Sequence, residues 1–246
     1  MSLCITALTI ALIALFAAAG VACARARYAI GQRLLWMSWA GCLILLAGNA
    51  ALAGAPPFGN MRHVLCFFPL ALAPGWLYLR RVRGMDLSVF FAGAAVIALI
   101  GAVCMPMQAG WRQMPALQSP WFVPHVTSYV FSYGLLTVAT LLAAMGGERR
   151  LAQADAVVRL AFPFLTFGLW SGALWADAAW GRYWAWDIKE VWSLISWCIL
   201  LIYFHCCRDL PGWRRPLLCI GFAAVVVTFL VVNLLPKISS LHSYAL

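Results

Sequence analysis

The feature that most constrains this chain is a succession of apolar runs, each roughly 20 residues long, separated by short charged segments. An α-helix of that length can cross the ~30 Å hydrocarbon core of a bilayer. Because 65% of the residues are hydrophobic and only 10% are charged, a soluble fold could not bury the apolar surface. We therefore predict an all-α, polytopic transmembrane helix bundle. About eight spans are expected, at residues 3–24, 34–54, 63–79, 86–106, 125–145, 157–176, 191–207 and 216–235.

No long linker, composition change or internal repeat divides the 246 residues, which predicts one integral membrane domain over residues 1–246. The first run lacks a charged leader and a small-residue cleavage site, so we expect a retained span rather than a signal peptide. The nine cysteines show no CxxC spacing, and we interpret them as small apolar residues. The adjacent pair Cys206 and Cys207 is left open.

Basic residues in alternate loops predict the orientation of the chain. Of the 17 Lys and Arg residues, most lie in the loops that follow the first, third, fifth and seventh spans. The positive-inside rule then puts both termini on the outer side, together with segments 107–124, 177–190 and 236–246. The net charge of +10 is explained by these loops, and no nucleic acid is expected as a partner.

Four tryptophans gather in the sequence WGRYWAWDIKEVW, between the sixth and seventh runs. An aromatic belt at the membrane interface would explain one or two of them. Four tryptophans interleaved with charges are better explained by a platform for a large, flat, anionic ligand such as haem. Indole faces would stack on the ligand, while a cation pairs with its carboxylates. The candidate residues are Trp180, Arg182, Tyr183, Trp184, Trp186, Asp187, Lys189, Glu190 and Trp192.

The charged members of this group have different expected roles. Arg182 or Lys189 would pair with the carboxylates of the ligand. Asp187 and Glu190 would either orient the loop or a histidine, or pair with these cations as structural residues. Both interpretations stay open at this point.

Histidines are costly within a bilayer, so each of the four is a functional candidate. His125 opens the fifth span and His242 follows the eighth, so the predicted topology puts both on the outer side. Two neutral imidazoles can ligate haem iron from opposite faces, although a merely solvated interface histidine is the alternative for each. His205 lies about 21 Å inward from Val191 along the seventh run, and a histidine at the inner headgroup level next to Arg208 is the alternative to a functional residue. His63, at the outer end of the third run, is interpreted as an interface residue rather than a third external ligand.

Three motifs resemble one known family. WGRYWAWDIKEVWSLI, from Trp180 to Ile195, resembles the WWD signature of haem-handling proteins, and its WDxKExWxLIxW pattern is similar to the CcsA/ResC branch of system II cytochrome c biogenesis. The segment from Met114 through His125 and the LHSY segment at His242 resemble the regions of that family's external histidines. The resemblance covers residues 110–246 as a cytochrome c assembly core, with an external haem-binding loop at 177–192. Ile188 departs from the usual proline, and no NLYE-like segment is evident in the N-terminal third.

The resemblance implies a holocytochrome c synthase (haem lyase) component that attaches haem to the CxxCH motif of apocytochrome c. The implied bound substrate is haem b, with His125 and His242 as external ligands and His205 as an inner ligand. The implied location is a bacterial inner membrane or a thylakoid-type equivalent, with the active site on the outer face. Implied partners are a ResB/Ccs-type membrane protein, apocytochrome c, membrane lipid and, indirectly, a thioredoxin-like thiol reductant. The partner subunit is also the expected source of a second inner ligand.

Three other functions compete with this prediction. A haem chaperone or exporter without ligation activity would share the loop and the histidines. A b-type electron-transfer protein would carry histidine pairs on its spans, and no predicted span has two. A transporter of another solute is disfavoured because no Asp or Glu is expected at mid-membrane. No nucleophile or general base is apparent, so no catalytic residue is assigned beyond those that position haem.

Overall fold

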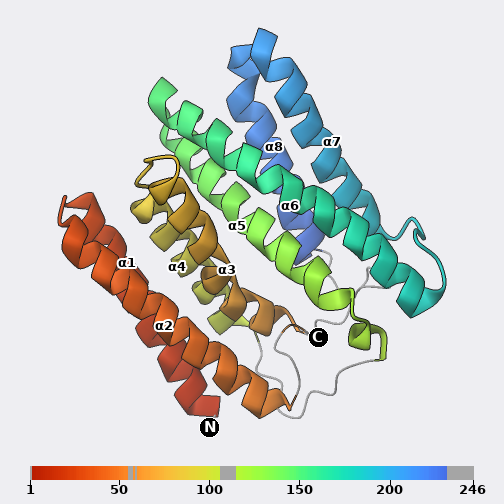
Figure 1. Cartoon of the computed structure of the whole chain (residues 1–246), viewed down its shortest axis with the longest axis horizontal. Coiled ribbons are helices and arrows are strands. Elements are labelled where there is room, and N and C mark those ends of the chain that lie inside the picture. Colours follow the sequence, from red (N-terminus) through yellow and green to blue (C-terminus); the bar gives the residue numbers. More distant parts are fainter. Residues whose placement is uncertain (1, 55–57, 59, 106–114, 232–246) are drawn as a thin grey trace. The chain divides into compact units, whose positions relative to one another are not determined.

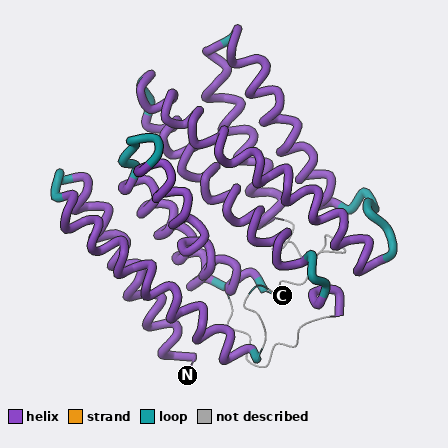
Figure 2. The backbone as a smooth tube through the Cα atoms, in the orientation of Figure 1, coloured by secondary structure: helices purple, strands orange, loops and turns teal. Residues whose placement is uncertain are grey.

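The structure is a computed structural model that describes residues 2–54, 58, 60–105 and 115–231, without the side chains of residues 2 and 206–208 (Figure 1). Within these ranges every regular element is a helix (Figure 2), which confirms the all-α prediction. The chain divides into two compact units, Met1–Gln113 and Met114–Leu246, which we describe separately. The expectation of a single domain stays a prediction.

The described part of the first unit consists of α1 (Ser2–Ala24), α2 (Tyr28–Ala53), α3 (Met61–Arg81) and α4 (Ser88–Cys104). Helix α1 packs against α2 and α4, and α3 packs against the same two helices. The indole N–H of Trp76 donates to Ser88 Oγ at 2.9 Å, and that of Trp39 donates to the Pro69 carbonyl at 3.0 Å. Large aromatic side chains can therefore be buried here without leaving a polar group unsatisfied.

A buried arginine ties two helix ends of this unit together. Arg62, only 5% exposed, donates from Nη1 to the carbonyls of Ala102 and Met105, each at 3.0 Å. These carbonyls belong to the C-terminal end of α4, where the helix dipole favours a positive charge. The neighbouring Asn60 caps α3, because its side chain accepts from the backbone N–H of His63 at 2.8 Å. The His63 side chain itself is buried within the unit.

The described part of the second unit contains η1 (Pro115–Gln118), α5 (Phe122–Met145), α6 (Glu148–Trp180), α7 (Ile188–Asp209), η2 (Pro211–Trp213), α8 (Arg214–Val226) and a π-helical turn, η3 (Val227–Val231). Helix α5 packs against α6 and α8, and α7 packs against α8 and α6. Short connections make successive long helices antiparallel (Figure 1). The start of α5, the end of α6 and the start of α7 therefore lie at one end of this unit.

Small residues on α6 allow α5 to approach it closely. Ser132 Oγ donates to the Ala161 carbonyl at 3.0 Å. One turn earlier on α5, the Tyr129 ring lies against Gly168, where an added Cβ would be 3.1 Å from the ring. Side chains spaced by three or four residues on α5 thus meet Ala and Gly on α6, a common way for membrane helices to pack.

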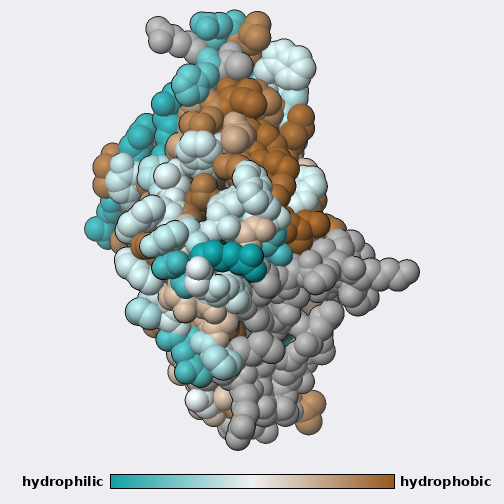
Figure 3. Space-filling view, turned by 90° about the vertical axis from the view of Figure 1, so that its right-hand side faces the viewer, coloured by the Kyte–Doolittle hydropathy of each residue, from teal (hydrophilic) through white to brown (hydrophobic). Residues whose placement is uncertain are grey.

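The described residues of the eight apolar runs lie almost entirely on helices, and six helices within the described ranges are long and apolar enough to span a membrane. These are α1, α2, α5, α6, α7 and the segment Pro211–Val231, whereas α4 is shorter and α3 falls outside the group. Apolar side chains gather in a brown region in the upper part of the face drawn in Figure 3, and large apolar residues such as Ile44 and Trp170 are exposed. The integral membrane character is therefore confirmed, while the number of spans and the side of each terminus stay predictions.

Helix α6 is longer than the sequence indicates. It contains 33 residues, whereas the predicted span is 157–176. At 1.5 Å per residue it extends about 50 Å, well beyond the ~30 Å hydrocarbon core. The apolar pattern marks only the part suited to lipid, because polar residues such as Glu148 and Arg149 form helix equally well outside it.

Candidate functional site

His125 lies in the first turn of α5, and a backbone carbonyl fixes its protonation pattern. The Nδ1 atom is 2.8 Å from the carbonyl oxygen of Gly168. Because a carbonyl can only accept, Nδ1 must carry the hydrogen, and the lone pair of the neutral ring is then on Nε2. Histidines that bind metals commonly have this arrangement, since the bond from the second nitrogen orients the ring. If His125 binds a metal, it therefore does so through Nε2.

Packing restricts the His125 ring from three further directions. It stacks on Trp175 with 5.4 Å between ring centroids and 27° between planes. The Tyr129 ring meets it edge-on at 4.9 Å. On the α6 side, a Cβ on Gly172 would lie 2.6 Å from two imidazole atoms. The ring is held by contacts from both α5 and α6.

Trp175 connects His125 to the beginning of the tryptophan loop, which we define as residues 177–192. Its indole N–H donates to the Ala116 carbonyl at 2.6 Å, and its ring lies 5.0 Å from that of Trp180. His125 and Trp180 are thus joined through one buried aromatic ring. Sequence reasoning missed Trp175, because it lies in an apolar run where a tryptophan is usually a packing or lipid-facing residue.

The non-helical part of the tryptophan loop exposes aromatic surface. Helix α6 ends at Trp180, followed by Gly181 with φ of 73°, whose N–H donates to the Asp177 carbonyl at 2.8 Å. Beyond this cap, Trp186 is 71% exposed and packs edge-on against Trp184 at 5.8 Å between centroids. Tyr183 and Arg182 are also exposed. Open aromatic faces beside a cation are what the platform hypothesis requires.

Asp187 and Glu190 together form a capping box at the start of α7. Asp187 Oδ2 accepts from the backbone N–H of Lys189 at 3.2 Å, while Glu190 Oε2 accepts from that of Asp187 at 3.1 Å. Glu190 Oε2 also accepts from the N–H of Ala185 at 2.8 Å. The two carboxylates therefore stabilise the junction of loop and helix, one of the two roles that the sequence leaves open.

Between the two amides that Glu190 binds, Trp186 adopts a left-handed backbone with φ of 57°. A non-glycine residue in this region costs about 1–2 kcal/mol. Hydrogen bonds to charged groups contribute about 1.5–3 kcal/mol each. Two hydrogen bonds to Glu190, which is 8% exposed, thus stabilise the backbone on both sides of Trp186, while its other oxygen, Oε1, is buried with no partner among the described residues.

The other two residues of the predicted platform are on α7 itself. Lys189 lies in its first turn and Trp192 about one turn later, and both side chains are partly exposed. Neither is in the non-helical part of the loop. In the non-helical part of the loop, the exposed cation is Arg182. In the same part, the indole N–H of Trp184 is buried with no hydrogen-bond partner among the described residues.

His205 lies near the other end of α7, about 25 Å along the helix from its first residue. Its Nδ1 atom is 2.8 Å from the Leu201 carbonyl, which again assigns the hydrogen to Nδ1 and the lone pair of the neutral ring to Nε2. The side chain is exposed on the helix surface. His205 thus lies toward the end of this unit that is opposite to the start of α5, where His125 is found.

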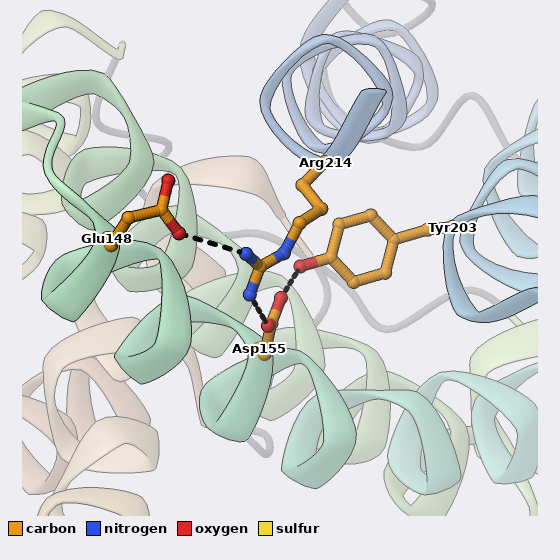
Figure 4. A network of polar contacts seen from close by, with 4 residues as sticks. All are labelled: Glu148, Asp155, Tyr203 and Arg214. Carbon is orange, nitrogen blue, oxygen red and sulfur yellow. Dashed lines mark hydrogen bonds and ion pairs between the residues drawn. The ribbon is translucent and has the colours of Figure 1, made fainter. Parts of the chain in front are cut away.

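Close to His205, a polar network joins three helices (Figure 4). Asp155 on α6 accepts from the Tyr203 hydroxyl on α7 and forms an ion pair with Arg214 at the start of α8. Arg214 also lies 3.4 Å from the carboxylate of Glu148. This network was not predicted, because the pairing of α6, α7 and α8 brings together residues far apart in the sequence.

Two sets of predicted residues lie wholly or partly outside the described part of the chain. His242, expected as the second external ligand, is in the undescribed segment 232–246. The side chains of Cys206 and Cys207 are likewise not described. The seven cysteines with described side chains are free thiols: Cys23, Cys42 and Cys66 are buried, and Cys4, Cys104, Cys198 and Cys219 are exposed.

Comparisons with known proteins identify the family. Residues 59–240 match the family described as "Cytochrome C assembly protein". A cytochrome c biogenesis protein CcsA from Chlamydomonas reinhardtii is 38% identical over 232 residues, with 82% of this chain and 64% of that protein covered. The chain belongs to the CcsA family. CcsA proteins of Synechococcus elongatus and Gloeothece citriformis are each 30% identical, over 82% of this chain and 83% and 84% of their own lengths.

Membership of the CcsA family confirms the resemblance found in the motifs and assigns this integral membrane protein a role in cytochrome c biogenesis. Assembly of a cytochrome c involves haem and an apocytochrome. This CcsA-family chain spans somewhat less than two thirds of the Chlamydomonas protein. The family match begins at residue 59, in the first unit, whereas the three motifs lie within residues 110–246.

Proposed function

We propose that this chain binds haem on the outer face of the membrane and presents its vinyl groups to the two thiols of a CxxCH motif in apocytochrome c. In each thioether-forming step, a thiol adds across a vinyl C=C bond: sulfur bonds to one carbon and hydrogen to the other. The addition releases no leaving group and requires no external oxidant or reductant. The protein must therefore supply position and exclusion of side reactions rather than a nucleophile.

The observation that carries this proposal is the environment of His125. The bond from Nδ1 to the Gly168 carbonyl assigns the lone pair of the neutral ring to Nε2, and stacking on Trp175 restrains the imidazole. Through Trp175 the same histidine is linked to Trp180, at the beginning of the tryptophan loop. An iron ligand beside an aromatic platform fits haem better than it fits a bare metal ion.

The remaining roles complete the proposal. His242 supplies the second axial ligand, and Arg182 pairs with a propionate. After the thioethers form, the histidine of the CxxCH motif displaces one of the two ligands and the product leaves. His205 holds haem at the inner side before it moves outward, with a second ligand from a ResB/Ccs-type partner.

The test begins with absorption spectra of the detergent-purified protein, produced with its partner and an apocytochrome c. We expect a bis-histidine haem spectrum whose outer-site component is lost in His125→Gly and restored when imidazole is added to that variant. The control is His63→Ala, a substitution of a buried histidine in the first unit, which should retain the outer-site spectrum. Wild-type protein that stays haem-free with ample haem present would contradict the proposal.

Covalent haem in the co-produced cytochrome provides the second readout and separates ligation from haem binding alone. We expect His125→Gly to lower it together with the spectrum. If wild-type protein binds haem but a reconstituted reaction forms no thioether, the chain is a haem chaperone, and the ligation step of the proposal is wrong.

A further inference from the structure

In the tryptophan loop, Trp186 has a backbone conformation that is unfavourable for a residue with a bulky side chain. Trp186 has φ of 57°, a region usually occupied by glycine or asparagine. Its indole is 71% exposed, so burial of the ring does not compensate for this conformation. A strained residue is retained where the surrounding structure enforces it, and such residues gather at functional sites.

The enforcing contacts come from one carboxylate oxygen. Glu190 Oε2 accepts from the backbone N–H groups of Ala185 and Asp187, the two residues that flank Trp186. A capping box requires only the bond to Asp187, because that residue precedes the helix. The bond to Ala185 lies outside the helix and satisfies none of its first N–H groups. Its direct effect is to fix the backbone on the other side of Trp186.

We infer that Glu190 is a positioning residue that holds Trp186 in its left-handed conformation, so that the exposed indole stacks on bound haem. The identity of that ligand rests on the function proposed above. Glu190 itself is 8% exposed, and it acts through the backbone amides of the loop without touching haem. Trp186 supplies the contact surface, and Glu190 determines where that surface lies.

The conformational part of the inference is tested without haem. In protein labelled with 5-fluorotryptophan, the Trp186 resonance is assigned by its loss in Trp186→Phe. We expect Glu190→Ala to shift or broaden this resonance by fluorine NMR. Glu190→Gln should leave it near its original position, because one amide oxygen can accept both N–H groups. The matched control is Glu148→Ala, a first-turn glutamate of α6 that is exposed and remote from the loop.

The functional part is tested by the haem retained through purification. We expect a several-fold loss in Glu190→Ala, near-normal retention in Glu190→Gln and no change in Glu148→Ala. Trp186→Gly provides a variant without backbone strain, since glycine adopts positive φ readily and only the indole is removed. It should fold normally and lose haem as Glu190→Ala does.

An unchanged Trp186 resonance in Glu190→Ala would overturn the inference, as would wild-type haem retention in Trp186→Gly. If Glu190→Ala does not fold, Glu190→Gln and Trp186→Gly still decide the question. Haem-free wild-type protein would overturn the proposed function instead, while a shifted resonance would still support the positioning role of Glu190.

Discussion

Gly172 on α6 lies directly against the imidazole of His125 on α5. A Cβ at this glycine would be 2.6 Å from both Cε1 and Nδ1 of the ring, closer than Cβ atoms approach other atoms in real structures. Any larger residue must therefore displace the ring or separate the helices. The position of the candidate haem ligand is set by the packing of α5 on α6.

Gly172→Ala should consequently alter haem binding without removing a ligand. We expect a changed haem spectrum and a loss of stability of about 1–3 kcal/mol, as for other overpacked cores. The matched control is Gly48→Ala, where the added Cβ would be 3.8 Å from Ile5, an ordinary contact. Spectra and thermal unfolding in detergent measure both effects. An unchanged spectrum in Gly172→Ala would show that the His125 ring does not need this space.

Two substitutions of Trp175 should distinguish the contribution of its aromatic packing to stability from that of its hydrogen bond. Trp175→Ala removes a buried indole and should cost about 3–5 kcal/mol of unfolding free energy, with a weakened haem spectrum. Trp175→Phe retains a stacking ring for His125 but loses the bond to the Ala116 carbonyl, at a cost of about 1 kcal/mol. The exposed Trp213 provides the control, since Trp213→Ala should leave both quantities nearly unchanged. Equal effects of Trp175→Ala and Trp213→Ala would contradict this account.

The network in Figure 4 predicts unequal effects for its two carboxylates. Removing one partner of a buried ion pair costs about 3–5 kcal/mol, but the Asp155 side chain is 26% exposed, so we expect about 1–3 kcal/mol for Asp155→Ala. Glu148, with an 87% exposed side chain, should contribute little. Thermal unfolding of Asp155→Ala and Glu148→Ala compares the two carboxylates, and Asp155→Ala, Arg214→Ala and their combination give the coupling of the ion pair. Similar losses for Asp155→Ala and Glu148→Ala would be inconsistent with the structure.

His205→Ala should reduce function while leaving stability intact. The side chain is exposed and its Nδ1 bonds only within its own helix turn, so we expect a stability change within about 0.5 kcal/mol. If His205 holds haem on its way outward, covalent haem in a co-produced cytochrome should fall. The control is Ile202→Ala, an exposed apolar position on the same helix. Unaltered cytochrome yield in His205→Ala would exclude the inner haem site.

The two ends of α6 should be accessible from opposite sides of the membrane. Tyr183 follows this helix and Arg149 lies in its first turn, and both are exposed. In a cysteine-free background, Tyr183→Cys should react with a membrane-impermeant maleimide added outside whole cells. Arg149→Cys should react only after the membrane is opened. The reverse pattern would invert the predicted orientation and move the tryptophan loop to the inner side.

The candidate site residues that could be predicted are those whose chemical type is unusual for their place in the sequence. The tryptophan loop, its charged residues and His125 stand out in the sequence because aromatic, charged and imidazole groups are unusual beside apolar runs. Trp175 and Gly172 do not stand out, since tryptophan and glycine are ordinary residues of membrane helices. Their importance depends on which side chain of α5 lies opposite them, and the apolar pattern of a single helix carries no information about that register.

Sequence alone determined the all-α membrane architecture, because apolar length and backbone hydrogen bonding leave few other solutions in lipid. It also determined the family and which segments carry unusual chemistry. Only the tertiary structure decided that the Gly168 carbonyl selects the His125 tautomer, that Glu190 binds the amides flanking Trp186, and that Asp155 meets Tyr203 and Arg214. Such contacts need atoms within about 3 Å of each other, so they depend on how helices and loops pack rather than on which residues they contain.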